Sequence, residues 1–79
     1  MLSAWYLAVY LKTTNNWTMK IEHSESESMC LKQARKHWKE YWQAGAQDES
    51  KMQLKCYDDA YMTQYWIHCT RYDSCTVKG

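Results

Sequence analysis

Residues 4–12 read AWYLAVYLK, and the alternation within this stretch decides the fold class. Side chains of a β-strand point to opposite faces in turn, so a strand with one dry face shows an apolar residue at every second position. One face here would carry Trp5, Leu7, Val9 and Leu11, and the other Tyr6, Tyr10 and Lys12. The stretch therefore predicts a strand of a sheet whose second face holds tyrosines.

The next segment, 17–23, alternates in the same way after the turn-forming residues 13–16, TTNN. Asn tolerates the positive φ that a tight turn requires, so we expect residues 1–23 to form a β-hairpin. Trp17, Met19 and Ile21 are expected to join the core, and Thr18, Lys20 and Glu22 to point the other way.

Residues 24–45 predict a helix. Ser24 with Glu27 fits a capping box, and Ser28 is an alternative cap. From Met29 onward the apolar residues follow helical spacing, and Gly45 provides the stop. The expected buried side holds Leu31, Ala34, Trp38, Tyr41 and Trp42, and the opposite side holds Lys32, Arg35, Lys36 and Lys39.

Residues 51–72 return to the two-residue period. Met52, Leu54 and Cys56 oppose Gln53, Lys55 and Tyr57, and the segment 58–60 is expected to turn. Residues 61–72 predict a long strand with either Tyr65, Ile67 and Cys69 or Trp66, His68 and Thr70 toward the core; a short helix over 59–66 is the alternative. Residues 73–79 are expected to be a frayed tail.

Together these elements predict one α+β domain over residues 1–79, a single antiparallel sheet in the order β-β-α-β-β with one helix packed on one face. The 79 residues include five Trp and seven Tyr but no Phe and no Pro, and the net charge is +1. Trp and Tyr join a polar group to a large apolar body, which suits binding surfaces. The small net charge argues neither for bulk polyanion binding nor for an acidic surface that mimics DNA, although the helix concentrates the cations.

The cellular setting follows from the start of the chain and its cysteines. The apolar stretch from Leu2 to Leu11 lacks the basic region and cleavage site of a signal peptide, and no run has the length of a membrane span. We therefore expect a cytoplasmic protein with four reduced cysteines and no membrane partner. A Cys69–Cys75 disulfide, between the closest pair in sequence, is the alternative.

No pattern in the sequence indicates catalysis, a metal or a cofactor. Zinc-type C-x-x-C and H-x-x-x-H pairs are missing. The helix dipole favours a reactive thiolate at Cys30, at the expected helix start, but His37 lies about 10 Å further along the axis, too far to act as its base. Gly45 and Gly79 cannot form a glycine-rich phosphate loop. We therefore expect a non-enzymatic protein.

The predicted partner-binding surface joins the uncovered sheet face to the basic side of the helix. It comprises Tyr6, Tyr10, Lys12, Lys20, Lys55, Tyr57, Lys32, Arg35, Lys36 and Lys39. Such residues stack on single-stranded nucleic acid, dominate protein–protein hot spots, or form the seam of a homodimer. A plain sheet face of cross-strand tyrosine pairs and a solvated helix face are the alternatives without function.

Residues 31–36, LKQARK, follow the serines in a way that resembles the helix starts of small phage-encoded inhibitors, including anti-CRISPR proteins. The resemblance extends to size and to the outline of hairpin, helix and further strands. It implies an inhibitor that sterically blocks a host defence protein or ribonucleoprotein complex in the cytoplasm of a bacterial host. A small single-stranded nucleic-acid-binding domain and a cysteine-stapled secreted domain are the alternative functions.

Overall fold

The computed structural model describes residues 4–60 and 62–78 and shows one antiparallel sheet with one α-helix. The elements in chain order are β1 (Trp5–Thr13), β2 (Asn16–Ser24), α1 (Glu27–Gln43), the 3-10 helix η1 (Glu49–Lys51), β3 (Met52–Asp58), β4 (Thr63–Arg71) and β5 (Ser74–Lys78). The α+β class and the single helix are confirmed, but the predicted order lacked the fifth strand.

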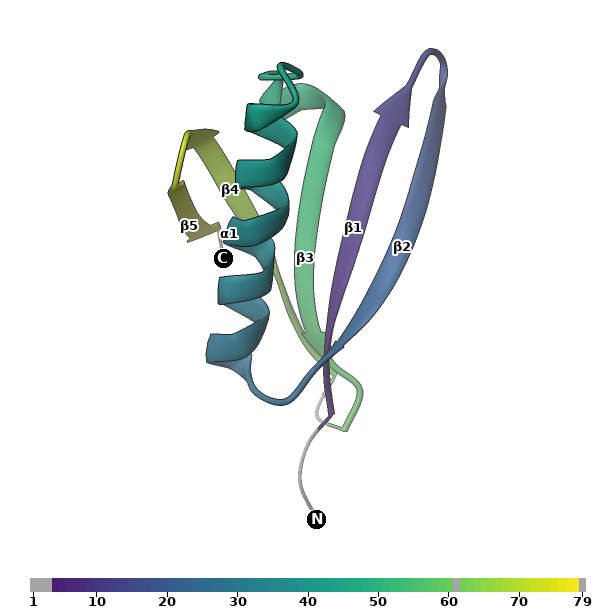
Figure 1. Cartoon of the computed structure of the whole chain (residues 1–79). Helices are drawn as coiled ribbons and strands as arrows, with labels where there is room; N and C mark the ends of the chain where they lie inside the picture. Colours follow the sequence, from purple (N-terminus) through teal and green to yellow (C-terminus); the bar gives the residue numbers. More distant parts are fainter. Residues whose placement is uncertain (1–3, 61, 79) are drawn as a thin grey trace.

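The five strands lie in the order β2-β1-β3-β4-β5, and every neighbouring pair is antiparallel. The chain leaves the sheet at edge strand β2, crosses one face as α1, and re-enters as β3 beyond β1. This crossover places the helix over one face only (Figure 1). The face turned away from α1 is called the open face below.

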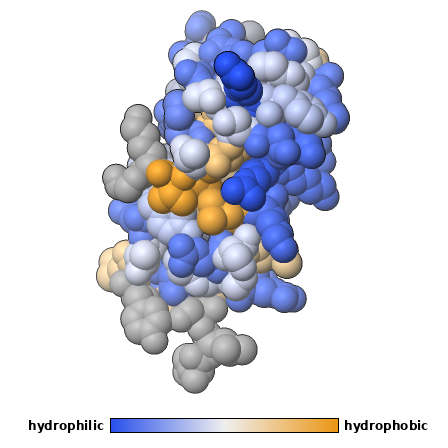
Figure 2. Space-filling view, turned by 90° about the vertical axis from the view of Figure 1, so that its left-hand side faces the viewer, coloured by the Kyte–Doolittle hydropathy of each residue, from blue (hydrophilic) through white to orange (hydrophobic). Residues whose placement is uncertain are grey.

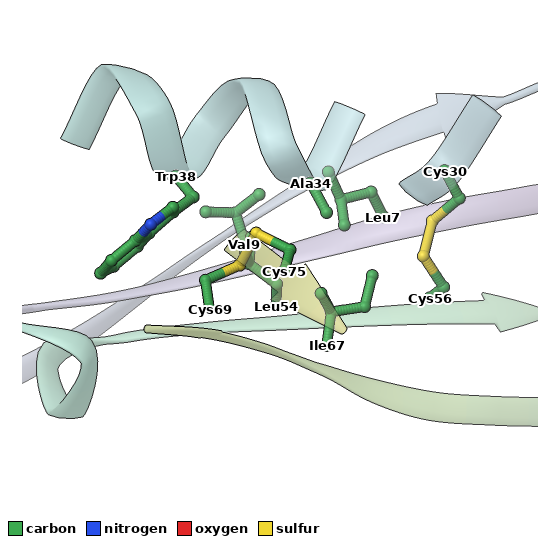
Figure 3. Packing of buried hydrophobic residues seen from close by; sticks show 10 residues of the cluster. All are labelled: Leu7, Val9, Cys30, Ala34, Trp38, Leu54, Cys56, Ile67, Cys69 and Cys75. Atoms are coloured by element: carbon green, nitrogen blue, oxygen red, sulfur yellow. A yellow bond between two sulfur atoms is a disulfide. The ribbon is translucent and has the colours of Figure 1, made fainter. Parts of the chain in front are cut away.

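The core fills the space between α1 and the sheet (Figure 3). Leu7, Ala34, Trp38 and Leu54 are almost completely buried there, as the predicted inward faces of β1, α1 and β3 require. The ring N–H of Trp38 donates a hydrogen bond to the carbonyl of Arg71, which ties the helix to the end of β4. Burial of one such ring removes a large apolar area from water.

The ends of the helix follow local chemistry. Ser26 is the N-cap, and its hydroxyl accepts from the Met29 N–H, so the expected caps Ser24 and Ser28 were wrong. Ser24 instead ends β2 and is buried, where its hydroxyl bonds Gln33. At the other end Gly45 adopts φ +88, and its N–H and that of Ala46 bond back into the last turn, the arrangement of a Schellman motif.

Strand β2 presents the opposite faces from those predicted. The two-residue turn pairs Thr13 with Asn16 and Lys12 with Trp17, and the register continues without a break to Trp5 and Ser24. Residues paired across a ladder share a face, so Trp17 lies on the same side as Lys12. Trp17, Met19 and Ile21 therefore lie on the open face, and Thr18, Lys20 and Glu22 lie on the helix side.

The C-terminal region departs from the prediction in two ways. Residues 74–78 form β5 instead of a frayed tail, paired with β4 through a register shift between Cys69 and Arg71. Strand β4 begins at Thr63, so the alternative short helix over 59–66 was wrong; the part of the predicted strand at residue 61 lies outside the described residues. Ile67 and Cys69 point into the core, which settles the face that the sequence left open.

All four cysteines are paired, which corrects the expectation of reduced thiols. Cys30–Cys56 joins α1 to β3 and Cys69–Cys75 joins β4 to β5. Residues 69 and 75 lie directly opposite each other in the ladder, with Cα atoms 4.1 Å apart. Cys30 is therefore no thiol nucleophile, whatever its place in the first turn of the helix.

Candidate binding surface

The open face gathers the outward residues of all five strands, and the ladder registers fix its membership. Its residues are Trp17, Met19, Ile21 and His23 of β2; Tyr6, Ala8, Tyr10 and Lys12 of β1; Gln53, Lys55 and Tyr57 of β3; Gln64, Trp66, His68 and Thr70 of β4; and Thr76 of β5. The described strand residues that face this way include no Asp or Glu, so among their charged side chains there are cations but no carboxylates.

A cluster of rings occupies the middle of the open face. The Tyr6 and Tyr57 rings stack with centroids 5.3 Å apart, and His23 meets Tyr6 edge-on at 5.6 Å. Tyr10 lies tilted against Trp66 at 5.8 Å. The three tyrosines are half-buried, and these cross-strand contacts restrict the movement of their rings.

Lys55 lies between the two halves of this cluster. Its Nζ is 5.5 Å from the ring centroids of both Tyr57 and Trp66, the separation of a cation–π contact. Burial, together with the nearby Tyr6 and Tyr10 hydroxyls, raises the pKa of Tyr57. The cluster thus combines three tyrosine rings, one tryptophan ring and the amino group of Lys55.

An apolar strip flanks the ring cluster along β2. Trp17, Met19 and Ile21 are 45%, 55% and 48% exposed, and Trp66 on the far side of the cluster is 43% exposed. These four large apolar side chains lie on one face and remain about half exposed to water. Folded chains usually avoid such a group unless another surface covers it. Sequence reasoning missed the β2 residues because it assigned them to the core.

Only part of the predicted surface comes together. Tyr6, Tyr10, Lys12, Lys55 and Tyr57 share the open face. Lys20 lies on the helix side of β2, where its Nζ is 3.5 Å from Glu22. The predicted helix cations Lys32, Arg35, Lys36 and Lys39 sit on α1, which covers the opposite face of the sheet, so they cannot join the aromatic surface (Figure 1).

Three of the four helix cations instead border a shallow hollow next to the turn before β5. Lys32, Lys36, Lys39, Glu40, Gln43 and Tyr72 line it. Lys39 is the most constrained, with its Nζ 3.9 Å from Asp73 and 5.3 Å from the Tyr72 ring centroid. Lys32, Arg35 and Lys36 lie on the outer side of the amphipathic helix, where a solvated face is expected.

A second hollow lies where β3 and β4 part. Their ladder ends at the pair Leu54–Ile67, and beyond it β4 continues with β5 alone. The space, about 400 Å³, is lined by residues that include Trp38, Met52 and Trp66. His68 Nε2 and Glu49 Oε2 face each other across its mouth at 3.9 Å.

The side of the molecule formed by β5 has fewer features that suggest a binding surface. Figure 2 views it directly and shows a largely hydrophilic surface around a central apolar patch. β5 exposes Val77, which pairs with Ile67. Single exposed apolar side chains of this kind are common on folded domains.

Chemistry beyond binding finds no support in the described part of the chain. No three His, Cys, Asp or Glu side chains converge there as metal ligands. The α-helix is too short and too polar to cross a membrane. The best-formed titratable contact, His37 Nε2 to Glu22 Oε2 at 2.9 Å, lowers the pKa of Glu22 and joins α1 to β2.

Comparison with known proteins gives no family model, no curated relative and no solved structure that matches this chain. Function is therefore inferred from the geometry of the open face.

Proposed function

We propose that this chain is a non-enzymatic binding domain that acts by covering the surface of a partner protein with its open face. The single observation that carries the proposal is the group of half-exposed side chains Trp17, Met19, Ile21 and Trp66 beside a pre-arranged ring cluster. Interfaces owe most of their binding free energy to a few residues, among which Trp and Tyr are enriched. A steric inhibitor, as the resemblance to phage proteins implies, is one role that such a surface can perform.

The two disulfides indicate in which cellular compartment the chain would meet a partner. Cystines persist in oxidising compartments and are rare in the cytoplasm, where thiol reductants keep cysteines reduced. Cys30–Cys56 and Cys69–Cys75 therefore favour an extracytoplasmic partner over the cytoplasmic one first expected. The cysteine-stapled secreted domain thereby becomes the preferred form of the binding proposal.

Site-specific photo-cross-linking in cells that naturally carry the chain tests the proposal. A cross-linking residue replaces Trp66 on the open face or, as a matched control, Tyr72 on the helix side; the two are 43% and 45% exposed. We expect one defined protein adduct from position 66, none from position 72, and loss of the position-66 adduct when Tyr10→Ala is added. Equal adducts from both positions would contradict docking through the open face.

A second candidate function is binding of single-stranded nucleic acid. The observation that favours it is the lack of carboxylates on the described open-face strand positions, with Lys12 and Lys55 beside Tyr6, Tyr10 and Tyr57. Stacking of a base on an aromatic ring contributes about 1–3 kcal/mol. Anisotropy of a labelled oligothymidylate separates the two: salt-dependent binding lost on Tyr10→Ala supports this candidate, and no binding at low salt excludes it.

A further inference from the structure

The two edges of the sheet differ in how they are closed. β5 has five residues, a register shift and a disulfide to its neighbour. β2 has nine residues in an unbroken register with β1, and no described element pairs with its outer side. It forms the free edge at the right of Figure 1. A long, regular edge strand presents a row of backbone N–H and C=O groups ready to pair with another strand.

The devices that usually protect such an edge are weak in β2. The chain has no Pro, and the lone lysine of the strand, Lys20, already has its charge opposed by Glu22 at 3.5 Å. The open-face side of the edge carries Trp17, Met19 and Ile21, all about half exposed. Both the backbone and the side chains of this edge therefore favour addition of a strand.

We propose that the added strand is β2 of a second copy of this chain, paired antiparallel with Ile21 on the twofold axis. The two five-stranded sheets then join into one continuous sheet with both helices on the same side. This interface uses the edge of β2, and it stands whether or not the open face docks a partner protein.

Charge complementarity favours a second copy of this chain as the added strand and determines which residues pair across the interface. With Ile21 on the axis, each Lys20 lies opposite the Glu22 of the other copy, and each Met19 lies opposite a His23. Cross-strand pairs of opposite charge stabilise a sheet, and like charges directly opposite each other destabilise it. Moving the axis to Lys20 places the two lysines opposite each other, and moving it to Met19 leaves no pair of opposite charge.

The geometry of Glu22 suits this role. Its side chain is held by the His37 contact at 2.9 Å yet is 27% exposed, and a carboxylate can accept several hydrogen bonds. On the other face the pairing would bring Ile21 against its own copy and extend the apolar strip across the axis. The dimer would thus bury part of the strip and double the number of ring clusters on one surface.

Sedimentation equilibrium of the oxidised chain, with reciprocal charge changes, tests the proposal. Lys20→Glu alone sets two glutamate pairs across the interface, and Glu22→Lys alone sets two lysine pairs, so each should raise the dimer dissociation constant about tenfold or more. Mixed in equal amounts, the two variants restore both opposite-charge pairs. We expect native mass spectrometry of the mixture to show the heterodimer in excess of either homodimer.

Lys32→Glu is the matched control, because it makes the same change of charge on the exposed side of the helix and should leave dimerisation unchanged. Ile21→Asp, at a half-exposed position, provides a second interface variant if Glu22→Lys fails to fold, and should abolish the dimer. The proposal would be overturned if the wild-type chain stayed monomeric up to about 1 mM. A dissociation constant of that size corresponds to a binding free energy of only about 4 kcal/mol. A dimer that the mixture of charge variants fails to rebuild would also overturn it.

Discussion

The two ends of the sheet are stabilised by different means. At the β4–β5 end the strands are fixed by the Cys69–Cys75 disulfide and by the Trp38 side chain bonded to the Arg71 carbonyl. At the β2–β1 end the long hairpin depends on its own ladder and on polar contacts with α1, chiefly His37 with Glu22. One end is closed by covalent and packing constraints, whereas the other is left available for contacts outside the monomer.

The contrast concerns how the constraints on stability are distributed over the sheet. A domain of this size has only about 3–5 kcal/mol of net stability from its core, so each constraint is a large fraction of the total. The disulfide and the Trp38 hydrogen bond lie near the place where β3 and β4 separate. The ladder between these two strands is shorter than the ladders of β1. The β2–β1 end, where Trp17, Met19 and Ile21 are about half exposed, contains no disulfide.

The largest expected effect is at Trp38. Trp38→Ala should lower the free energy of unfolding by about 3–5 kcal/mol, because it removes a ring that is 1% exposed and leaves the Arg71 carbonyl without its donor. Urea denaturation followed by circular dichroism measures it. Trp17→Ala at the other end should cost less than about 1 kcal/mol. Comparable losses at Trp38 and Trp17 would break the contrast between the two ends.

The disulfides should differ from each other in the same assay. Replacing both Cys30 and Cys56 by Ala removes a link across 26 residues and should cost about 3–4 kcal/mol, whereas replacing Cys69 and Cys75 opens a link across 6 and should cost about 2 kcal/mol. Longer closed loops restrict the unfolded chain more strongly. A greater loss from the Cys69 and Cys75 pair would show that strand pairing at the β5 end depends on its cystine.

A change of opposite sign is expected at the tip of the β1–β2 hairpin. Thr14 has φ +53, a left-handed conformation that a β-branched residue adopts at a cost. Thr14→Gly should raise the free energy of unfolding by about 1 kcal/mol, since Gly accepts positive φ at the first position of a two-residue hairpin turn. Asn15→Gly is the control and should bring no gain, because Asn15 is not among the described residues with positive φ.

The smallest expected effect depends on pH. The hydrogen bond from His37 is the main cause that lowers the pKa of Glu22 in the folded chain. Its contribution to stability is therefore complete above the unfolded value of about 4.3 and is lost as the pH falls through the lower folded value. Glu22→Gln should cost less than about 1 kcal/mol at pH 7 and should flatten the pH dependence of unfolding between about pH 5 and 3. An unchanged acid profile would mean that the contact does not persist in solution.

Much of the architecture could be predicted from alternation and helical spacing. The inward faces of β1, α1 and β3 were right, because each pattern has one clearly apolar side. Strand β2 has an apolar side as well, yet it was placed wrongly, since the register of a two-residue hairpin overrides the preference of single side chains. The pairing of Thr13 with Asn16, continued along both strands, sets Trp17 beside Lys12 and so gives the correct face.

The other errors arose from information that lies outside local pattern. Strand β5 has five residues and only Cys75 of its described side chains is buried, so its sequence carries little alternation to detect. The pairing of Cys30 with Cys56 depends on how the helix docks on β3, which no spacing rule specifies. For the candidate surface, half of the ten predicted residues share the open face. The helix residues were included because a sequence gives the charge of each residue but not the side of the sheet on which the helix packs.

The separation of the two cystines in sequence also has a consequence for how the oxidised chain is made. Four thiols can pair in three ways, and mispairing would trap the molecule. Cys69 and Cys75 are only 6 residues apart, so contact probability alone favours their early oxidation. Once they are joined, Cys30 and Cys56 are the two thiols that remain, and their one possible pairing is the native one.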